Sequence, residues 1–284
     1  VLEDFQKSYD YARDEVAAWK KVLSDKLEND AFKKMWNQAT KLELPDTIKW
    51  PSFDYGETIA TRKVWGKVIE ELAEKGTFLV GGSADLEPSN MTVGFAKMVG
   101  DFSKDNQSGM NLPYGVREFP MGAINNGIGL HGGLFVFGAT FFVFADYERP
   151  AIRLRALQKL PVISEFTHDS IYVGEDGPTH QPVEHLMACR AIPNLLVLRP
   201  GDANEAIVAS RIAFEQTNRP ALVLLTRQGL PVFDRNKYPS AEEFRKGGYI
   251  MQNCEGTPKV VIIATGSEVW VALEAAEKIS ENKV

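Results

Sequence analysis

The sequence predicts an α/β fold in which helices cover both faces of a parallel sheet. Three short apolar segments separated by helical patterns support this prediction: residues 161–167, 195–199 and 221–226. A fourth strand is predicted at 77–81, after a helix over 58–75 that stops at a glycine. Strands alternating with helices are typical of a parallel sheet buried on both sides.

Composition excludes several classes of protein. The 284 residues are 44% apolar and 25% charged, as in a soluble globular protein, and the net charge is −6. Nucleic-acid and membrane-surface binding need a basic face, so we expect neither partner. The uncharged stretch 119–145 contains six glycines and would make a poor membrane span. Cys189 and Cys254 give no metal or disulfide spacing, which favours a reduced, cytoplasmic setting.

The chain divides into three predicted regions. Residues 1 to about 46 are charge-rich, with apolar positions at helical spacing, and predict two or three surface helices. A glycine- and proline-containing connector over 233–259 precedes a strand at 260–264 and a helix at 269–279. One strand and one helix cannot close a core. We therefore expect a helical linker (1–57), a central domain (58–232) and an incomplete third domain (233–284).

Polar side chains follow several of the predicted strands. Ligands of parallel sheets bind beyond the carboxyl ends of the strands, so these loops are candidate site segments. Arginine, serine and histidine together suit a phosphate, because they supply charged and neutral donors. Each residue also has a structural alternative. His168 could be a buried structural histidine, Asp85 and Ser89 turn or cap residues, and Arg227 a surface ion-pair partner.

An aromatic stripe precedes the second of these loops. Phe141, Phe144 and Tyr147 recur at intervals of three and are expected on one side of a helix. Such a stripe serves either as core packing or as a pocket for a flat heterocycle, and spacing alone leaves both open. Further along, Asp202 with Glu205 three residues later predicts a capping box at a helix start.

Several of these segments, in this order, resemble the transketolase family over most of residues 58–284. The shared strings are Gly-Gly-Ser-Ala-Asp-Leu from 81, Pro-Ser-Asn from 88, Tyr-Gly-Val-Arg-Glu-Phe from 114, Thr-His-Asp-Ser-Ile from 167, Gly-Glu-Asp-Gly-Pro-Thr-His-Gln-Pro from 174 and Ala-Thr-Gly-Ser-Glu-Val from 264. The nine-residue run at 174–182 is highly specific. The resemblance implies the pyrimidine-binding fold of a thiamine-diphosphate enzyme.

The resemblance also implies residue roles. Glu118 would be the catalytic glutamate at N1′ of the aminopyrimidine. The remaining cofactor residues would be Phe141, Phe144 and Tyr147 around the ring and Asp85 on the thiazolium side. The sugar phosphate would be held by Arg62, Ser89, His168 and Arg227, and the hydroxyl and carbonyl end of the sugar by Asp176 and His180, the latter also catalytic.

The implied activity is transfer of a two-carbon ketol unit from a ketose phosphate to an aldose phosphate through a thiamine diphosphate ylid, as in the pentose phosphate pathway. The resemblance also implies a homodimer in which the active site is shared between the two subunits. Two related enzymes, dihydroxyacetone synthase and deoxyxylulose phosphate synthase, are alternatives within this chemistry. A non-catalytic dimerisation module is an alternative of another class.

One family signature is missing from the sequence. Relatives bind the diphosphate and its divalent metal (Mg²⁺ or Ca²⁺) through Gly-Asp-Gly on a preceding domain, and no such string occurs here. We therefore expect no ligand of that metal in this chain. We also expect an expressed or proteolytic fragment rather than a natural split subunit, inactive by itself.

Overall fold

The computed structural model describes residues 1–281, and their contacts form two units that divide after Glu43. The first unit contains two helices, α1 (Leu2–Leu27) and α2 (Asp30–Lys41), as the apolar spacing predicts. Asn29 is the N-cap of α2: its Oδ1 accepts a hydrogen bond from Phe32 N–H at 3.0 Å.

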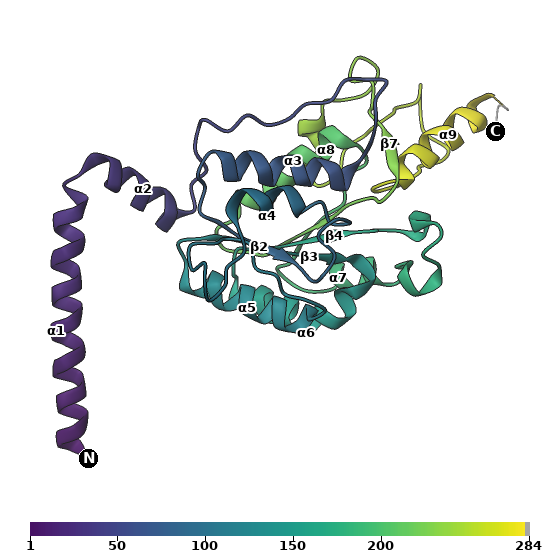
Figure 1. Cartoon of the computed structure of the whole chain (residues 1–284). Helices are drawn as coiled ribbons and strands as arrows, with labels where there is room; N and C mark the ends of the chain where they lie inside the picture. The colour runs from purple at the N-terminus through teal and green to yellow at the C-terminus, as the bar shows by residue number, and fades with distance from the viewer. Residues whose placement is uncertain (282–284) are drawn as a thin grey trace. The chain divides into compact units, whose positions relative to one another are not determined.

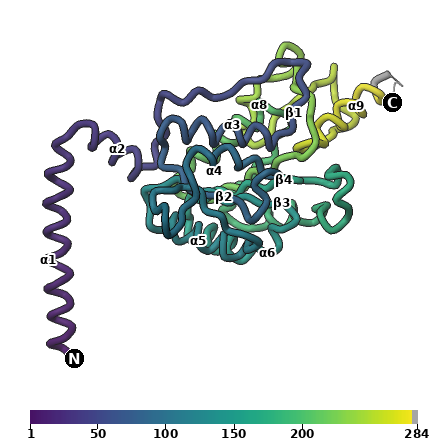
Figure 2. The backbone as a smooth tube through the Cα atoms, viewed as in Figure 1, coloured from purple at the N-terminus to yellow at the C-terminus, as the bar shows by residue number. Residues whose placement is uncertain are grey.

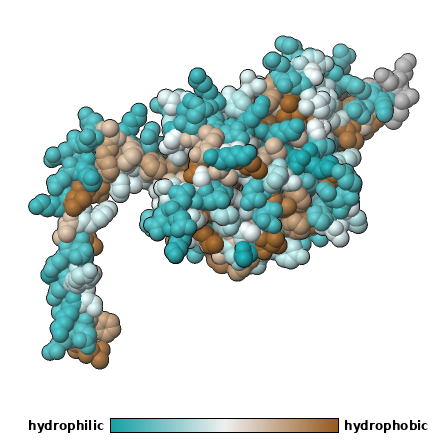
Figure 3. All heavy atoms as spheres, viewed as in Figure 1, coloured by the Kyte–Doolittle hydropathy of each residue, from teal (hydrophilic) through white to brown (hydrophobic). Residues whose placement is uncertain are grey.

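No residue of α1 or α2 is buried. Trp36 of α2 stacks on Phe32 at 6.1 Å and meets Trp19 of α1 at 6.4 Å, so aromatic rings are the main apolar contact of this unit. Figure 3 shows hydrophobic surface at the start of α1, where Val1 and Leu2 are exposed.

The second unit is built on a five-stranded parallel sheet (Figure 1). Its strands, in spatial order, are β2 (Leu79–Ser83), β3 (Phe135–Phe141), β4 (Val162–Thr167), β6 (Ala221–Leu224) and β5 (Leu196–Leu198). All four strand pairs are parallel, which confirms the predicted fold class. β2, β3, β4 and β6 are buried along their whole length.

Helices cover both faces of this sheet, as Figures 1 and 2 show. One face carries α3 (Thr61–Glu74), α4 (Val93–Val99) and α8 (Ala203–Phe214). The other carries α5 (Glu118–His131), α6 (Ala145–Gln158) and α7 (His185–Arg190).

An aromatic cluster joins the first helical layer to the sheet. Trp65 of α3 is fully buried, stacks on Phe214 of α8 at 5.7 Å, and meets Phe137 of β3 edge-on at 5.8 Å. Each such side chain contributes about 1.5–3 kcal/mol through burial. The opposite layer packs closer: a Cβ at Gly138 would lie 2.5 Å from Asn125 Nδ2. That glycine therefore lets α5 rest directly on β3.

Two sequence predictions are corrected, one in a separate two-stranded sheet and one within the five-stranded sheet. The helix expected from residue 58 begins at Thr61, because Thr58–Ala60 forms β1, antiparallel to β7 (Gly229–Pro231). β3 lies in a stretch expected to be helical or irregular, since its neighbouring glycines hide the strand pattern. The uncharged stretch 119–145 is thus divided between α5 and β3. Within residues 1–281, no helix is both long and apolar enough to cross a membrane.

The last described segment differs from expectation in one element. Residues 260–264 form no strand and are largely exposed, because no partner strand lies beside them in the described structure. The helix predicted at 269–279 is present as α9 (Glu268–Glu281), and Trp270 stacks on Phe233 at 4.7 Å. Half of the predicted capping box is present: Asp202 Oδ1 accepts from Glu205 N–H at 2.8 Å, but the Glu205 side chain accepts from Gly201 N–H rather than from Asp202 N–H.

Candidate active site

The aromatic residues lie where β3 ends. Phe141 is the last residue of that strand, Phe144 belongs to the 3-10 turn η1 (Phe142–Phe144), and Tyr147 is in the first turn of α6. The expectation that all three share one helical side is therefore wrong. They still lie together, since the strand passes directly into the turn: Phe141 and Phe144 stack at 5.9 Å, and Phe144 meets Tyr147 at 6.1 Å. Tyr147 is 64% exposed, so the row of rings is open at one end.

His168 connects this aromatic row to the end of β4. Its ring stacks on Phe141 with centroids 3.7 Å apart, and the residue is only 2% exposed. Its φ of 58° is unusual for a non-glycine residue and places the side chain at the sheet edge. Burial, followed by the charges of Arg62 and Arg227, lowers the pKa of His168 to about 3. The ring is therefore neutral at pH 7.

A buried hydrogen-bond chain fixes the tautomer of that neutral ring. Thr167 Oγ1 donates its hydrogen to Asn90 Oδ1 at 2.8 Å, so it must accept the hydrogen bond from His168 Nδ1–H, also at 2.8 Å. Asn90 Nδ2 in turn donates to Ser83 Oγ at 2.9 Å. Nδ1 consequently carries the hydrogen, and His168 Nε2 is left as an acceptor 3.9 Å from an Asp176 oxygen.

Two arginines lie on the other side of His168. Arg62, the second residue of α3, donates to the Ser89 carbonyl at 2.8 Å, while its buried Nε has no hydrogen-bond partner in the described structure. Arg227, after β6, donates to Glu175 and lies 3.8 Å from Asp176. Burial, then the charge of Arg227, lowers the pKa of Arg62. The two cations are therefore close enough to repel each other and to share an anion.

A buried carboxyl group lies beneath these cations. Glu165 of β4 is completely buried, and neither side-chain oxygen has a hydrogen-bond partner in the described structure. Burial raises the pKa of Glu165 well above its usual range, and the charge of Arg62 only partly offsets this. The protonated form of Glu165 is therefore favoured by burial, which weakens its charge compensation of Arg62.

His180 and Asp176 lie on the segment after β4. His180 ends the turn η3 (Pro178–His180) and presents its ring edge-on to Phe144 at 5.5 Å and to Phe141 at 6.1 Å. Asp176 faces both His168 and Arg227. The two histidines thus contact the same aromatic ring from different directions.

Glu118 is the first residue of α5, 9% exposed, and no hydrogen bond or ion pair within residues 1–281 engages its carboxyl group. It lies close enough to Glu148 of α6 for its charge to contribute to the raised pKa of that residue, behind the larger effect of burial. Asp85 follows β2 with φ 64° and is exposed; no ion pair in the described region joins it to the other candidates.

Three buried residues beside the predicted set were not found from the sequence: Asn90, Thr167 and Glu165. The first two lie inside the quoted motifs, next to Ser89 and His168, and their polarity in a buried strand or loop was the available signal. Glu165 is a carboxyl residue in a completely buried strand of a parallel sheet, where apolar residues predominate.

Comparison with known proteins identifies the family of the chain. Residues 57–232 match the family model described as the transketolase pyrimidine binding domain, and residues 247–284 match the transketolase-like C-terminal domain. A transketolase of Geobacillus stearothermophilus is 49% identical over 246 residues, which cover 86% of this chain and 36% of that protein. The chain therefore spans little more than a third of that relative's length.

Solved structures give the same result. Transketolase from Leishmania mexicana matches with a TM-score of 0.88 and 38% identity, covering 96% of this chain and 40% of that one. A Pichia stipitis transketolase in complex with sedoheptulose 7-phosphate matches with a TM-score of 0.87 and 36% identity, covering 96% and 41%. Because the pyrimidine-binding model alone covers more than half of the residues, we conclude that the chain belongs to the transketolase family.

Proposed function

We propose that this chain supplies the pyrimidine-binding half of a thiamine diphosphate site, in an enzyme that transfers a two-carbon ketol unit from a ketose phosphate to an aldose phosphate. One observation carries the proposal: His168 stacks on Phe141 at 3.7 Å and lies close to Arg62 and Arg227. An aromatic pocket for a heterocycle and a cationic clamp for a phosphate are thus contiguous.

The residues present fit the cofactor. A flat heterocycle needs ring surfaces, which Phe141, Phe144 and Tyr147 offer, and N1′ needs a carboxyl group that no other group already binds, which describes Glu118. Thiamine diphosphate supplies an electron sink for breaking a C–C bond beside a ketone. The role of Glu118 is to hold a proton at N1′ and so favour the imino form of the ring.

The sugar phosphate is assigned to the opposite end of the site. Arg62 and Arg227 provide two positive charges for one phosphate, with Ser89 and His168 as further polar contacts. Asp176 and His180 address the hydroxyl and carbonyl end, where His180 lies against the aromatic rings. The Pichia stipitis relative, solved with a seven-carbon sugar phosphate, supports this substrate class.

The remaining parts of the site are proposed outside the stretch that this chain shares with its relatives. The diphosphate and its divalent metal would bind there, whereas Asp85 of this chain would lie on the thiazolium side of the cofactor. A second subunit would close the open end of the aromatic row, where Tyr147 is exposed, and give a homodimer. The two free cysteines support a cytoplasmic setting, and the substrates support a place in the pentose phosphate pathway.

The decisive experiment replaces Glu118→Gln in an enzyme that joins this chain to the remaining length of its relatives. We expect ketol transfer to fall by at least about 100-fold, within the range that proton-transfer groups contribute. Glu74→Gln, at an exposed position on α3, is the matched control and should keep full activity. Activity close to wild type in the Glu118 variant would refute the assignment, provided that circular dichroism shows both variants folded.

A further inference from the structure

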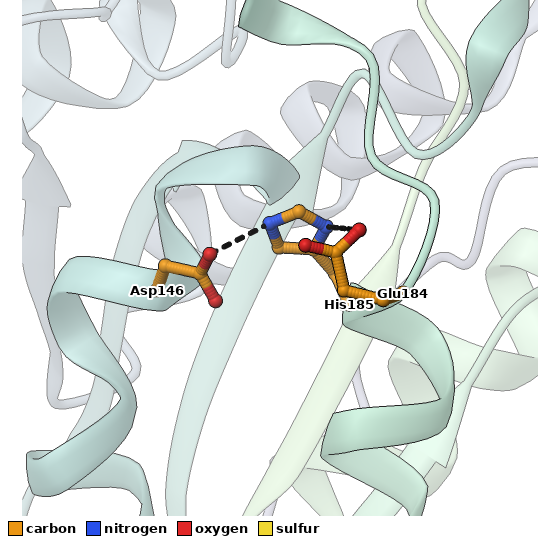
Figure 4. Close-up of side chains that lie close together, drawn as sticks. All are labelled: Asp146, Glu184 and His185. Carbon is orange, nitrogen blue, oxygen red and sulfur yellow. Dashed lines mark ion pairs between the residues drawn. The ribbon is translucent and has the colours of Figure 1, made fainter.

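Three potential metal ligands meet where α6 and α7 begin, away from the arginine clamp (Figure 4). Asp146 is in the first turn of α6, and Glu184 immediately precedes His185, the first residue of α7. His185 Nε2 lies 3.1 Å from Asp146 Oδ2, and its Nδ1 lies 3.9 Å from Glu184 Oε2. One ligand atom from each residue lies within 4.8 Å of the others.

The imidazole of His185 is the unusual member of this cluster. The residue is 4% exposed, and neither ring nitrogen makes a hydrogen bond with any described residue, although both are buried. Leaving a buried polar group unpaired costs about 1–3 kcal/mol. In Figure 4 each ring nitrogen faces a different carboxylate, Nε2 facing Asp146 and Nδ1 facing Glu184. An ion held by Nε2 and Asp146 Oδ2 would therefore gain Glu184 as its third ligand when that side chain turns toward it.

We propose that Asp146, Glu184 and His185 bind a divalent transition-metal ion of the zinc type. One imidazole with two carboxylates and an open position is a ligand set that zinc accepts. Two ligands at about 2.0–2.2 Å from a tetrahedral ion are about 3.3 Å apart, close to the 3.1 Å between His185 and Asp146. The imidazole disfavours Mg²⁺ and Ca²⁺, which prefer oxygen, so this site differs from the diphosphate metal of the proposed function.

The contacts of the neighbouring side chains leave ligand atoms available for the ion. Arg149 donates to Asp146 Oδ1, which leaves Oδ2 for the metal. Glu184 has a side chain that is 73% exposed and can rotate toward the site at little cost. A bound ion would join the start of α6, beside Tyr147, to the start of α7, which follows the segment that carries His180.

The test uses the purified 284-residue chain after treatment with a chelator. We expect one equivalent of Co²⁺ to produce visible d–d absorption bands of a site with an imidazole ligand, Zn²⁺ to displace them, and excess Mg²⁺ to leave them unchanged. His185→Gln should abolish the bands, while His131→Gln, at an exposed histidine on α5, should retain them. Bands of equal intensity in both variants, or no bands in the wild type, would show that Asp146 and His185 form only an ion pair.

Glu184→Gln keeps the test independent of folding, because that side chain is mostly exposed. Losing a ligand should weaken Co²⁺ binding by at least about tenfold, since even changes outside the ligand shell typically cost 10–100-fold. Zn²⁺ should raise the Tm of the wild type more than that of this variant. An identical Zn²⁺-induced shift in both proteins would overturn the proposal.

Discussion

Strand β4 places Ser164 and Glu165 on opposite faces of the sheet. The two faces differ in how their buried charged side chains are hydrogen-bonded. On the α6 face, Arg155 donates to Ser164 at 2.7 Å, to Asn126 at 2.8 Å and to the Glu148 carboxylate. On the α3 face, Glu165 has no hydrogen-bond partner in the described structure and lies near Arg62, whose Nε is also unpaired. We call these the paired face and the clamp face.

We infer that the buried charges of the paired face stabilise the fold, whereas those of the clamp face are suited to binding a ligand. On the paired face Arg155 and Glu148 are completely buried and bound to each other, although burial raises the pKa of Glu148 and its Oε2 has no hydrogen-bond partner in the described structure. On the clamp face Arg62 and Arg227 repel each other, and burial raises the pKa of the Glu165 carboxyl well above its usual range. We infer that a phosphate dianion would supply the charge that the clamp face lacks.

The largest effect is expected on the paired face. Arg155→Ala leaves Glu148 buried without its counter-charge, and breaking such a pair costs about 3–5 kcal/mol. Urea unfolding should therefore show a large loss of stability. Arg153→Ala, an exposed arginine on the same helix, should change stability by no more than about 0.5 kcal/mol. Equal stability of the two variants would mean that the buried pair does not hold α6 against the sheet.

The next effect concerns the clamp face and its ligand. The measurement uses an enzyme that joins this chain to the remaining length of its relatives. In that enzyme, Arg227→Ala should raise KM for a ketose phosphate about 10–100-fold, since a charge-assisted hydrogen bond contributes about 1.5–3 kcal/mol. KM for an unphosphorylated analogue should change far less. Glu175→Gln is the informative companion, because Glu175 binds Arg227 in the free protein. This variant should lower KM for the phosphorylated sugar. Equal changes with both sugars would argue against a phosphate contact.

Local sequence patterns predicted most of the strands and helices around the clamp face. They did not predict how the buried charges are paired on the two faces of the sheet. The strands at 161–167, 195–199 and 221–226 are apolar runs between helical patterns and could be located directly. β3 was missed because Gly138 and its neighbours serve close packing against α5 rather than strand formation. The expected strand at 260–264 failed for the opposite reason: its apolar pattern is clear, but pairing needs a neighbour that local sequence cannot supply.

The candidate residues were located by strand-end position and family motifs, whereas their electrostatics depend on folding. His168 is recognisable in Thr-His-Asp-Ser, yet its neutral state follows from burial and from two arginines 106 and 59 positions away. Glu165 and Arg62 are also distant in sequence. The pairing of Arg155 with Glu148, seven residues apart on one helix, was closer to prediction, but its burial was not.

A smaller effect should appear in the pH dependence of stability on the clamp face. The folded state keeps Glu165 protonated above the pH at which the unfolded chain loses that proton. Stability therefore falls as pH rises above about 4.5, by up to about 1.4 kcal/mol per pH unit until folded Glu165 ionises. Glu165→Gln removes this slope, so its stability relative to wild type should increase between pH 5 and pH 8, as measured by urea unfolding. Glu74→Gln is the control, and parallel curves for wild type and Glu165→Gln would contradict the buried, protonated carboxyl.

The smallest expected effect is a fraction of a proton taken up when a sugar phosphate binds. Burial and the charges of Arg62, Arg227 and His180 lower the pKa of His168 to about 3, while Asp176 lies 3.9 Å from its Nε2. A bound phosphate neutralises the two arginines and offers Nε2 an acceptor, so the pKa of His168 should rise and the ring should gain part of a proton near pH 6. Titration calorimetry in two buffers of different ionisation enthalpy measures this uptake directly. His168→Asn should bind without it, and wild-type heats that are independent of the buffer would show that His168 stays neutral and contacts the substrate only as an acceptor.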